Sequence, residues 1–285
     1  MTKLQHKIYL FVLTSIPIFA FFFLLFWGFS YYVSPLDQRF YHDLHKVLKP
    51  NGLIGHGLGI IGSLLMLFGV GIYMLRKRVK AFYRLGVLKH WLELHIFMCT
   101  LGPILVLFHT SFKFGGIVSI SFWSMVAVVL SGVIGRFIYV QIPRTIQGEE
   151  LSLNQLRELT DKIHDNMISN FKLTSEVINK IEEKNKVEYK LNFTIFIKEF
   201  LKGFFIIYEV KNYLKKLNVS SKTIEEISKS IKQQFIINRK IKYLKTMQKY
   251  FRFWHIVHLP FAIIMLIIMI IHVIVSIVFG YTWIF

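Results

Sequence analysis

Five stretches of the chain are apolar and long enough to cross a bilayer, and polar segments separate them. They lie at about 8–33, 53–75, 91–110, 117–141 and 254–281. Each contains roughly 20 apolar residues, the length that a helix needs to span the hydrocarbon core. The first stretch is too long for a signal-peptide core and has no small-residue cleavage site, so we expect it to be retained. The pattern predicts an all-α integral membrane bundle of five transmembrane helices.

Lys and Arg residues between the apolar stretches predict the orientation. Segment 76–89 contains six of them and no acidic residue, whereas the C-terminal tail 279–285 contains none. Cytoplasmic loops are enriched in Lys and Arg. We therefore expect a cytoplasmic N-terminus and, after five spans, a periplasmic C-terminus, in a bacterial inner membrane.

The segment 145–250 differs from the rest because it holds all but three of the chain's 16 acidic residues. Its mixed charge does not suit lipid, so we expect a helical cytoplasmic insert between a membrane part at 1–144 and a last span at 251–285. The apolar run at 191–210 contains charged residues and is interpreted as a core or interfacial helix.

Helix starts within the insert are predicted from capping residues. Ser152, Thr174 and Ser220 are of the type that accepts a hydrogen bond at a helix N-terminus. Neither Gly nor Pro occurs between about 222 and Pro260, so the helix that starts there is expected to continue into the last span.

Composition supports a membrane protein. The chain is 54% hydrophobic and 18% charged, whereas soluble domains average about 25% charged residues. A net charge of +19 would indicate nucleic acid binding in a soluble protein. Here the positive residues fall in the insert and the inner loops, so we expect a lipid bilayer and no nucleic acid. The single cysteine, Cys99, excludes a disulfide framework, an iron–sulfur cluster or a Cys-based zinc site within this chain.

Four histidines lie within the apolar stretches, two in the third and two in the last. His95 and His109 are 14 residues apart, and so are His258 and His272. On an α-helix, 14 residues turn through about 1400°, some 40° short of four full turns, so each pair shares a face. The same interval rises about 21 Å, most of the hydrocarbon thickness. Ionisable groups inside spans are rare and are candidates for function.

The predicted topology puts these histidines at matching depths. The third and last spans run in the same direction, because one span and the insert lie between them. His95 and His258 then form a layer near the cytoplasmic surface, and His109 and His272 form one near the outer surface. A bis-imidazole haem takes one axial nitrogen from each side, so the arrangement predicts two iron sites holding haem b.

Two alternatives to haem remain. Isolated histidines can form interhelical hydrogen bonds. A zinc or copper site is less favoured, because each layer offers only two strong ligands. Covalent haem c is not expected, since the chain has no C-x-x-C-H sequence.

Two segments carry a resemblance to a known family. They run from His95-Ile96-Phe97 to Leu107-Phe108-His109 and from His258-Leu259-Pro260-Phe261 to Ile271-His272. Histidine pairs at this spacing on two helices resemble those of dihaem b-type membrane cytochromes, which include quinone-reactive cytochrome b subunits and the ferric-reductase-like transmembrane group. The resemblance covers about 90–141 and 252–285, and the large insert departs from the small members of the family.

The resemblance implies an electron-transfer subunit of a membrane oxidoreductase complex. Such a subunit transfers electrons between a quinone pool and redox partner subunits, which we expect to dock on the cytoplasmic insert. No flavin or nicotinamide module follows the last helix, so a complete ferric reductase is not expected. One alternative is a transporter that handles protons or metal ions with its intramembrane histidines; the scarcity of acidic residues in the spans and the lack of a visible inverted repeat disfavour it. Another is a structural anchor without a cofactor.

Residues around the paired histidines supply further candidates. Glu93, two residues before His95, either accepts a quinol proton or forms a salt bridge with the basic inner loops. Gly102, midway between His95 and His109, either lets a macrocycle approach the backbone or permits close helix packing. Arg136 and Arg252 lie where haem propionates would be expected, although the enrichment of positive residues inside explains them equally well.

Other histidines provide alternative ligands. His255 lies within about 20° of the face of His272 and is an alternative inner ligand. His56, near the outer end of the second span, either lines an outer quinone pocket, holds a further cofactor or is interfacial. His90 adjoins Glu93 and is the third histidine to be tested if the assigned ligands are wrong.

Overall fold

The structure is a computed structural model that describes residues 2–116, 118–144, 150–171 and 220–279, together with a few positions between 205 and 215. Its elements within these ranges are α1 (Lys3–Trp27), α2 (Phe29–Val33), η1 (Arg39–Tyr41), α3 (His45–Leu48), α4 (Leu53–Arg78), η2 (Lys80–Phe82), α5 (Leu88–His109), α6 (Val118–Gln141), α7 (Leu153–Phe171) and α10 (Ser221–Val278). The described residues contain helices and no strand, which confirms the predicted all-α fold.

Among the residues that the structure describes, five helices, namely α1, α4, α5, α6 and α10, are long and apolar enough to cross a membrane. Their outward surfaces are apolar: Phe11 is 71% exposed, Val133 67% and Ile274 55%. Apolar exposure on this scale is unfavourable in water but matches lipid tails. The protein is an integral membrane protein, and the prediction of five spans is confirmed.

The first span was predicted at 8–33, and these bounds are wrong at both ends. The helix begins at Lys3, because the side chain of Thr2 accepts a hydrogen bond from the backbone of Gln5 and that of Gln5 accepts one from Thr2. It ends at Trp27, and Gly28 separates it from α2. A Cβ at Gly28 would collide with the ring of Tyr32. A hydropathy pattern does not reveal this break between α1 and α2, because apolar residues continue across it.

Chain contacts divide the protein into two compact units. One contains the chain up to Phe137 and the chain from Phe251 onward, and the other contains α7 and the preceding part of α10. The expected N-caps of α7 and α10 are confirmed: Ser152 accepts from the backbone N–H of Gln155 at 3.3 Å, and Ser220 accepts from that of Thr223 at 3.2 Å. The expected cap at Thr174 and the apolar run at 191–210 lie outside the described residues.

The last span belongs to a longer helix than the apolar stretch 254–281 alone. Helix α10 runs unbroken from Ser221 to Val278 and includes Pro260. The prediction that the insert's final helix continues into the membrane is therefore confirmed.

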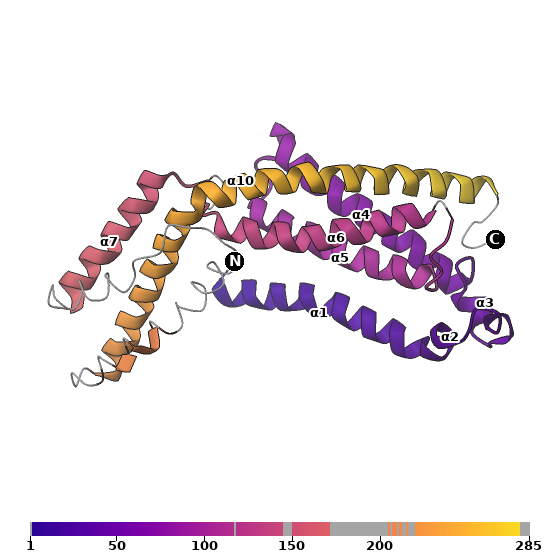
Figure 1. The fold of residues 1–285 in the computed structure, drawn as a ribbon, viewed down its shortest axis with the longest axis horizontal. Coiled ribbons are helices and arrows are strands. Elements are labelled where there is room, and N and C mark those ends of the chain that lie inside the picture. The colour runs from indigo at the N-terminus through magenta and orange to yellow at the C-terminus, as the bar shows by residue number, and fades with distance from the viewer. Residues whose placement is uncertain are drawn as a thin grey trace. The chain divides into compact units, whose positions relative to one another are not determined.

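Helices α4 and α5 form the closest helix pair of the membrane unit and lie side by side in Figure 1. They cross where two glycines meet: a Cβ on Gly62 would lie 2.7 Å from the carbonyl oxygen of Gly102, and a Cβ on Gly102 would lie 2.7 Å from that of Gly62. Only glycine at both positions allows the two backbones to approach this closely.

Helices α4, α5, α6 and α10 share one core. It contains Met66 of α4, Phe122 and Met125 of α6, and Met265 and Met269 of α10, with apolar side chains of α5 packed against them. Methionine is unbranched and flexible, so it fills irregular spaces between helices.

The C-terminal end of α5 is held by a buried arginine. The guanidinium of Arg39 donates to the carbonyl oxygens of Tyr32 and Ser111, each at 2.6 Å, and to that of Ser34 at 2.9 Å. Ser111 and Phe112 have positive φ angles of 48° and 59°, a conformation that L residues adopt rarely. The contacts of Arg39 stabilise this turn just after the last residue of α5.

Candidate functional site: two layers of histidines

The four intramembrane histidines lie on two helices, α5 and α10. His258 interacts electrostatically with His95, and His109 interacts with His272 and with His56 of α4. These interactions agree with the predicted parallel course of α5 and α10. We call His95 and His258 the inner layer and His109 and His272 the outer layer, after the predicted orientation.

Both histidines of α5 are anchored to backbone carbonyls of α4. Nδ1 of His95 lies 3.0 Å from the oxygen of Gly69, and Nδ1 of His109 lies 2.8 Å from that of Gly55. A carbonyl oxygen can only accept a hydrogen bond, so Nδ1 carries the proton in each ring. A neutral imidazole then keeps a free lone pair on Nε2. Histidines that bind metals commonly use their other nitrogen in this way.

The two anchors are symmetric about the glycine crossing. On α5, each histidine lies seven residues from Gly102, and on α4 each residue whose carbonyl oxygen accepts lies seven residues from Gly62. Seven residues are close to two helical turns, so they return to the same face. A glycine again makes the approach possible at the outer layer: a Cβ on Gly59 would lie 2.7 Å from Nδ1 of His109.

The histidines of α10 are held differently. Nδ1 of His258 lies 2.7 Å from the hydroxyl of Ser131 on α6, and that hydroxyl lies 2.9 Å from the carbonyl oxygen of Val128. The hydroxyl proton goes to the carbonyl, so Ser131 accepts from Nδ1–H, and Nε2 of His258 is free. His272 makes no hydrogen bond with the described part of the chain.

Aromatic rings lie beside the inner layer. Tyr73 of α4 stacks on His95 with ring centroids 5.2 Å apart, and the ring of Trp254 lies 4.7 Å from that of His258. The indole N–H of Trp254 donates to the carbonyl oxygen of Ser131 at 2.7 Å. A Cβ on Gly135 would collide with this indole, so glycine makes room for it.

The donor set fits haem iron. Three of the four imidazoles have Nδ1 engaged as a donor and Nε2 available, and each layer combines one ring from α5 with one from α10. Neutral imidazole is an axial ligand of haem iron. The assignment of His95, His258, His109 and His272 as ligands stays a prediction.

The alternative ligands lie close to the same layers. The ring centroid of His56 on α4 is 6.3 Å from that of His109, and His56 also interacts electrostatically with His272. His255 donates from Nδ1 to the carbonyl oxygen of Phe251 in its own helix at 3.0 Å, so its Nε2 is free as well. His258 interacts electrostatically with both His95 and His255, so the choice between His258 and His255 as the inner ligand of α10 stays a prediction.

Three other candidates are Gly102, Arg136 and Arg252. The space above Gly102 is taken by Gly62 and Met66 of α4, which agrees with the helix-packing alternative for this glycine. Arg136 is half-buried on α6, and Arg252 is exposed on α10. Their proposed role toward propionates stays a prediction.

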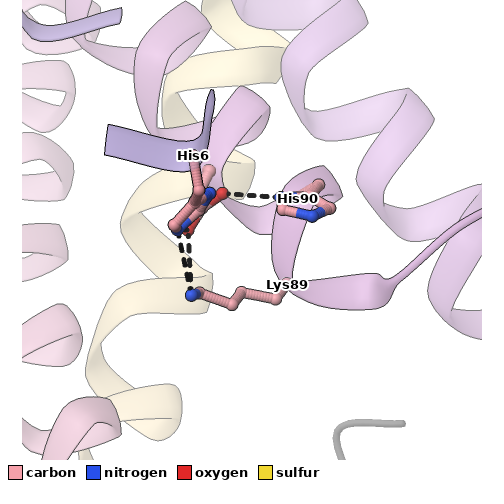
Figure 2. A network of polar contacts seen from close by, with 4 residues as sticks. His6, Lys89 and His90 are labelled. Atoms are coloured by element: carbon pink, nitrogen blue, oxygen red, sulfur yellow. Dashed lines mark hydrogen bonds and ion pairs between the residues drawn. The ribbon is translucent and has the colours of Figure 1, made fainter. Parts of the chain in front are cut away.

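Glu93 lies in a cluster of ionisable side chains where α1 meets α5. Its side chain is only 3% exposed, and Oε2 accepts from Nδ1 of His90 at 3.0 Å. Its other oxygen, Oε1, lies 3.5 Å from Nε2 of His6 and 3.8 Å from Nζ of Lys89. Figure 2 shows the side chains of His6, Lys89 and His90 converging. The contacts with Lys89 and His90 agree with the salt-bridge alternative; proton transfer from a quinol stays a prediction.

Sequence reasoning missed His6 and the roles of the α4 carbonyls and Ser131. The sequence did contain a signal for the α4 carbonyls, because Gly55, Gly62 and Gly69 repeat at the seven-residue interval that relates His95, Gly102 and His109. His6 had none, since no spacing in the sequence relates the N-terminal helix to Glu93.

Comparisons with known proteins identify no relative of this chain. No family model, curated protein or solved structure matches the chain.

Proposed function

We propose that the protein is a membrane cytochrome b subunit that transfers electrons across the bilayer. The observation that carries the proposal is the repeated arrangement of imidazoles on α5 and α10, in which His258 interacts electrostatically with His95 and His109 with His272. Along each helix the two layers are 14 residues apart, a rise of about 21 Å, so together they reach across most of the membrane.

In this proposal His95 and His258 hold one haem b, and His109 and His272 hold the other. Bound haem supplies reversible one-electron chemistry at its iron. The α4 carbonyls orient the rings of His95 and His109 and fix their tautomer. Ser131 does the same for His258. The buried methionines between the layers exclude water from the space that separates them.

The proposed electron partners are a quinone on one side and a redox subunit on the other. The apolar helices place the protein in the bilayer, where a quinone is dissolved. The basic, mixed-charge segment 145–250 is the proposed docking region for the redox subunit. In this scheme the chain is the electron-transfer part of a larger oxidoreductase complex.

A visible difference spectrum of the purified full-length protein tests the proposal. The dithionite-reduced minus oxidised spectrum should show the bands of haem b, and pyridine haemochrome analysis should give two non-covalent haems per chain. Absence of haem, or haem c, would contradict the proposal. A proton or metal transporter, the alternative function, would have no such spectrum.

A further inference from the structure

We propose that His6, His90 and Glu93 form a binding site for a divalent transition metal ion of the Zn²⁺ class. The site joins α1, which carries His6, to α5, which carries the other two residues. One ligand atom from each side chain lies within 4.8 Å of the other two. This site is separate from the two histidine layers and does not depend on the proposed function.

Nε2 of His6 and Oε1 of Glu93 lie close together, and the ammonium of Lys89 is the cation nearest to both. The ammonium of Lys89 can only donate, so Nε2 of His6, which lies 3.1 Å from it, accepts. Oε1 of Glu93 is an acceptor as well and lies 3.5 Å from the same Nε2. Two acceptors this close repel each other unless a cation lies between them.

Oε1 of Glu93 is also buried and lacks a hydrogen-bond partner. Oε1 of Glu93 is inaccessible to solvent and has no hydrogen bond, although Lys89 lies 3.8 Å away. A buried carboxylate oxygen without a hydrogen bond is costly. A metal ion would satisfy this oxygen directly.

The types of ligand atom in the cluster select the class of ion. Two imidazoles and one carboxylate form the His₂Glu set found in zinc sites, with a fourth position open to water. His90, whose Nδ1 donates to Oε2 of Glu93 in the metal-free site, binds through Nε2 or releases the Nδ1 proton when the ion binds. Ca²⁺ and Mg²⁺ prefer oxygen ligands and are disfavoured here. At usual zinc bond lengths, ligand atoms lie about 3.3 Å apart, so the cluster must contract slightly. His6 and His90, whose side chains are 22% and 38% exposed, have room to turn.

Lys89 is the competitor that such an ion must displace. Its side chain is 53% exposed and its stem is flexible, so the ammonium can turn into solvent when the ion binds. In this view Lys89 acts as an internal counter-ion of the metal-free site. Removing its charge should therefore strengthen metal binding, whereas removing a ligand should weaken it.

Zinc binding to the purified full-length protein in detergent tests the site. Equilibrium dialysis against buffered Zn²⁺, with metal quantification, should give one tight site per chain. His6→Ala, His90→Ala and Glu93→Gln should each weaken it by about 100-fold or more, because loss of a partner outside the ligand set alone costs about 10- to 100-fold. His42→Ala is the matched control, since His42 lies outside the cluster, and it should bind Zn²⁺ as the original protein does.

The Lys89→Met variant distinguishes a specific effect on Zn²⁺ affinity from a loss of binding caused by misfolding. It should bind Zn²⁺ more tightly, by about tenfold, a gain that a folding defect would not produce. Equal affinity in Lys89→Met and the original protein, or equal losses in His42→Ala and the three ligand variants, would overturn the proposal. The haem spectrum is measured separately, so failure of this site and failure of the proposed function remain distinguishable.

Discussion

The helix pair α4–α5 and the pair α6–α10 hold their histidines in different ways. Both histidines of α5 donate to main-chain carbonyls of α4, at equal intervals from one glycine crossing. On α10, His258 depends on the side chain of Ser131, and His272 has no hydrogen bond with the described residues. One half of each layer is thus fixed by backbone geometry, and the other half by a side chain or by packing alone.

The difference between the two helix pairs shows what glycine contributes to α4–α5. A helical carbonyl oxygen keeps a second lone pair after its own helical hydrogen bond, but side chains usually shield it. Glycines along one face of α4 remove that shield, so the rings of α5 can reach the backbone. Such an anchor has no side chain that could be lost by substitution. The comparison predicts that α4–α5 is sensitive to added volume, whereas α6–α10 is sensitive to the loss of a polar group.

The largest effect is expected from adding a methyl group at the crossing. In Gly102→Ala the new Cβ would lie 2.7 Å from the oxygen of Gly62 and 2.8 Å from Cγ of Met66, so the two helices must separate. Because both anchors depend on this crossing, haem content should fall at both layers, with a stability loss of about 1–3 kcal/mol from overpacking. Haem absorbance per chain and the thermal midpoint Tm measure the two effects.

Gly71→Ala is the matched control for this substitution. Gly71 also lies in α4, but a Cβ there meets nothing within 4 Å. The variant should keep both haems and the original Tm or a slightly higher one, since alanine favours helix more than glycine does. If Gly71→Ala and Gly102→Ala behave alike, the crossing does not set the two layers.

An intermediate effect is expected from removing one proposed ligand. His109→Ala or His272→Ala should abolish the outer haem and keep the inner one, so that about half of the haem absorbance remains, because the layers are about 21 Å apart along the helices. His95→Ala and His258→Ala should do the reverse. Quantitative haemochrome analysis of the four variants measures the loss, with His255→Ala as the control that keeps both haems.

Full haem content in all four ligand variants would show that the ligand assignment is wrong. In that case His255, His90 and His56 are the next residues to replace. A selective loss of the inner haem in His255→Ala would show that His255, and not His258, is the inner ligand from α10.

The smallest effect is expected from loosening the side-chain anchor of α10. Ser131→Ala removes the acceptor for Nδ1–H of His258 and leaves its ring in place. Loss of such a supporting hydrogen bond commonly weakens a metal site by about 10- to 100-fold. The inner haem should therefore transfer faster to apomyoglobin, while the outer haem transfers at its original rate. Ser131→Thr, which keeps the hydroxyl, should restore the original rate; unchanged transfer in Ser131→Ala would argue against a role for this anchor.

Much of the membrane fold was accessible from the sequence, because the spans depend on local hydropathy. The long continuous helix α10 followed from the lack of Gly and Pro before Pro260. The break at Gly28 was missed because it depends on the packing of Tyr32, which hydropathy does not report. The prediction that His95 and His258 share one layer rests on helix periodicity and topology, and their electrostatic interaction agrees with it.

The cluster around Glu93 shows where sequence reasoning stops. Its contact with Lys89 and His90 lies within one helix and follows from i, i+3 and i, i+4 spacing. Its contact with His6 depends on how α1 rotates and slides against α5. Large apolar side chains allow many such arrangements, so only the three-dimensional structure identifies this partner.

The glycine crossing also determines when the rings of α5 lose their freedom. Once α4 and α5 have packed, His95 and His109 are already hydrogen-bonded through Nδ1, and their rotamer entropy has been lost during folding. The proposed haem ligation would then require little further ordering of these side chains, which is the advantage of preorganisation. Since one crossing prepares both rings together, the α5 side would impose no order in which the two proposed haems bind.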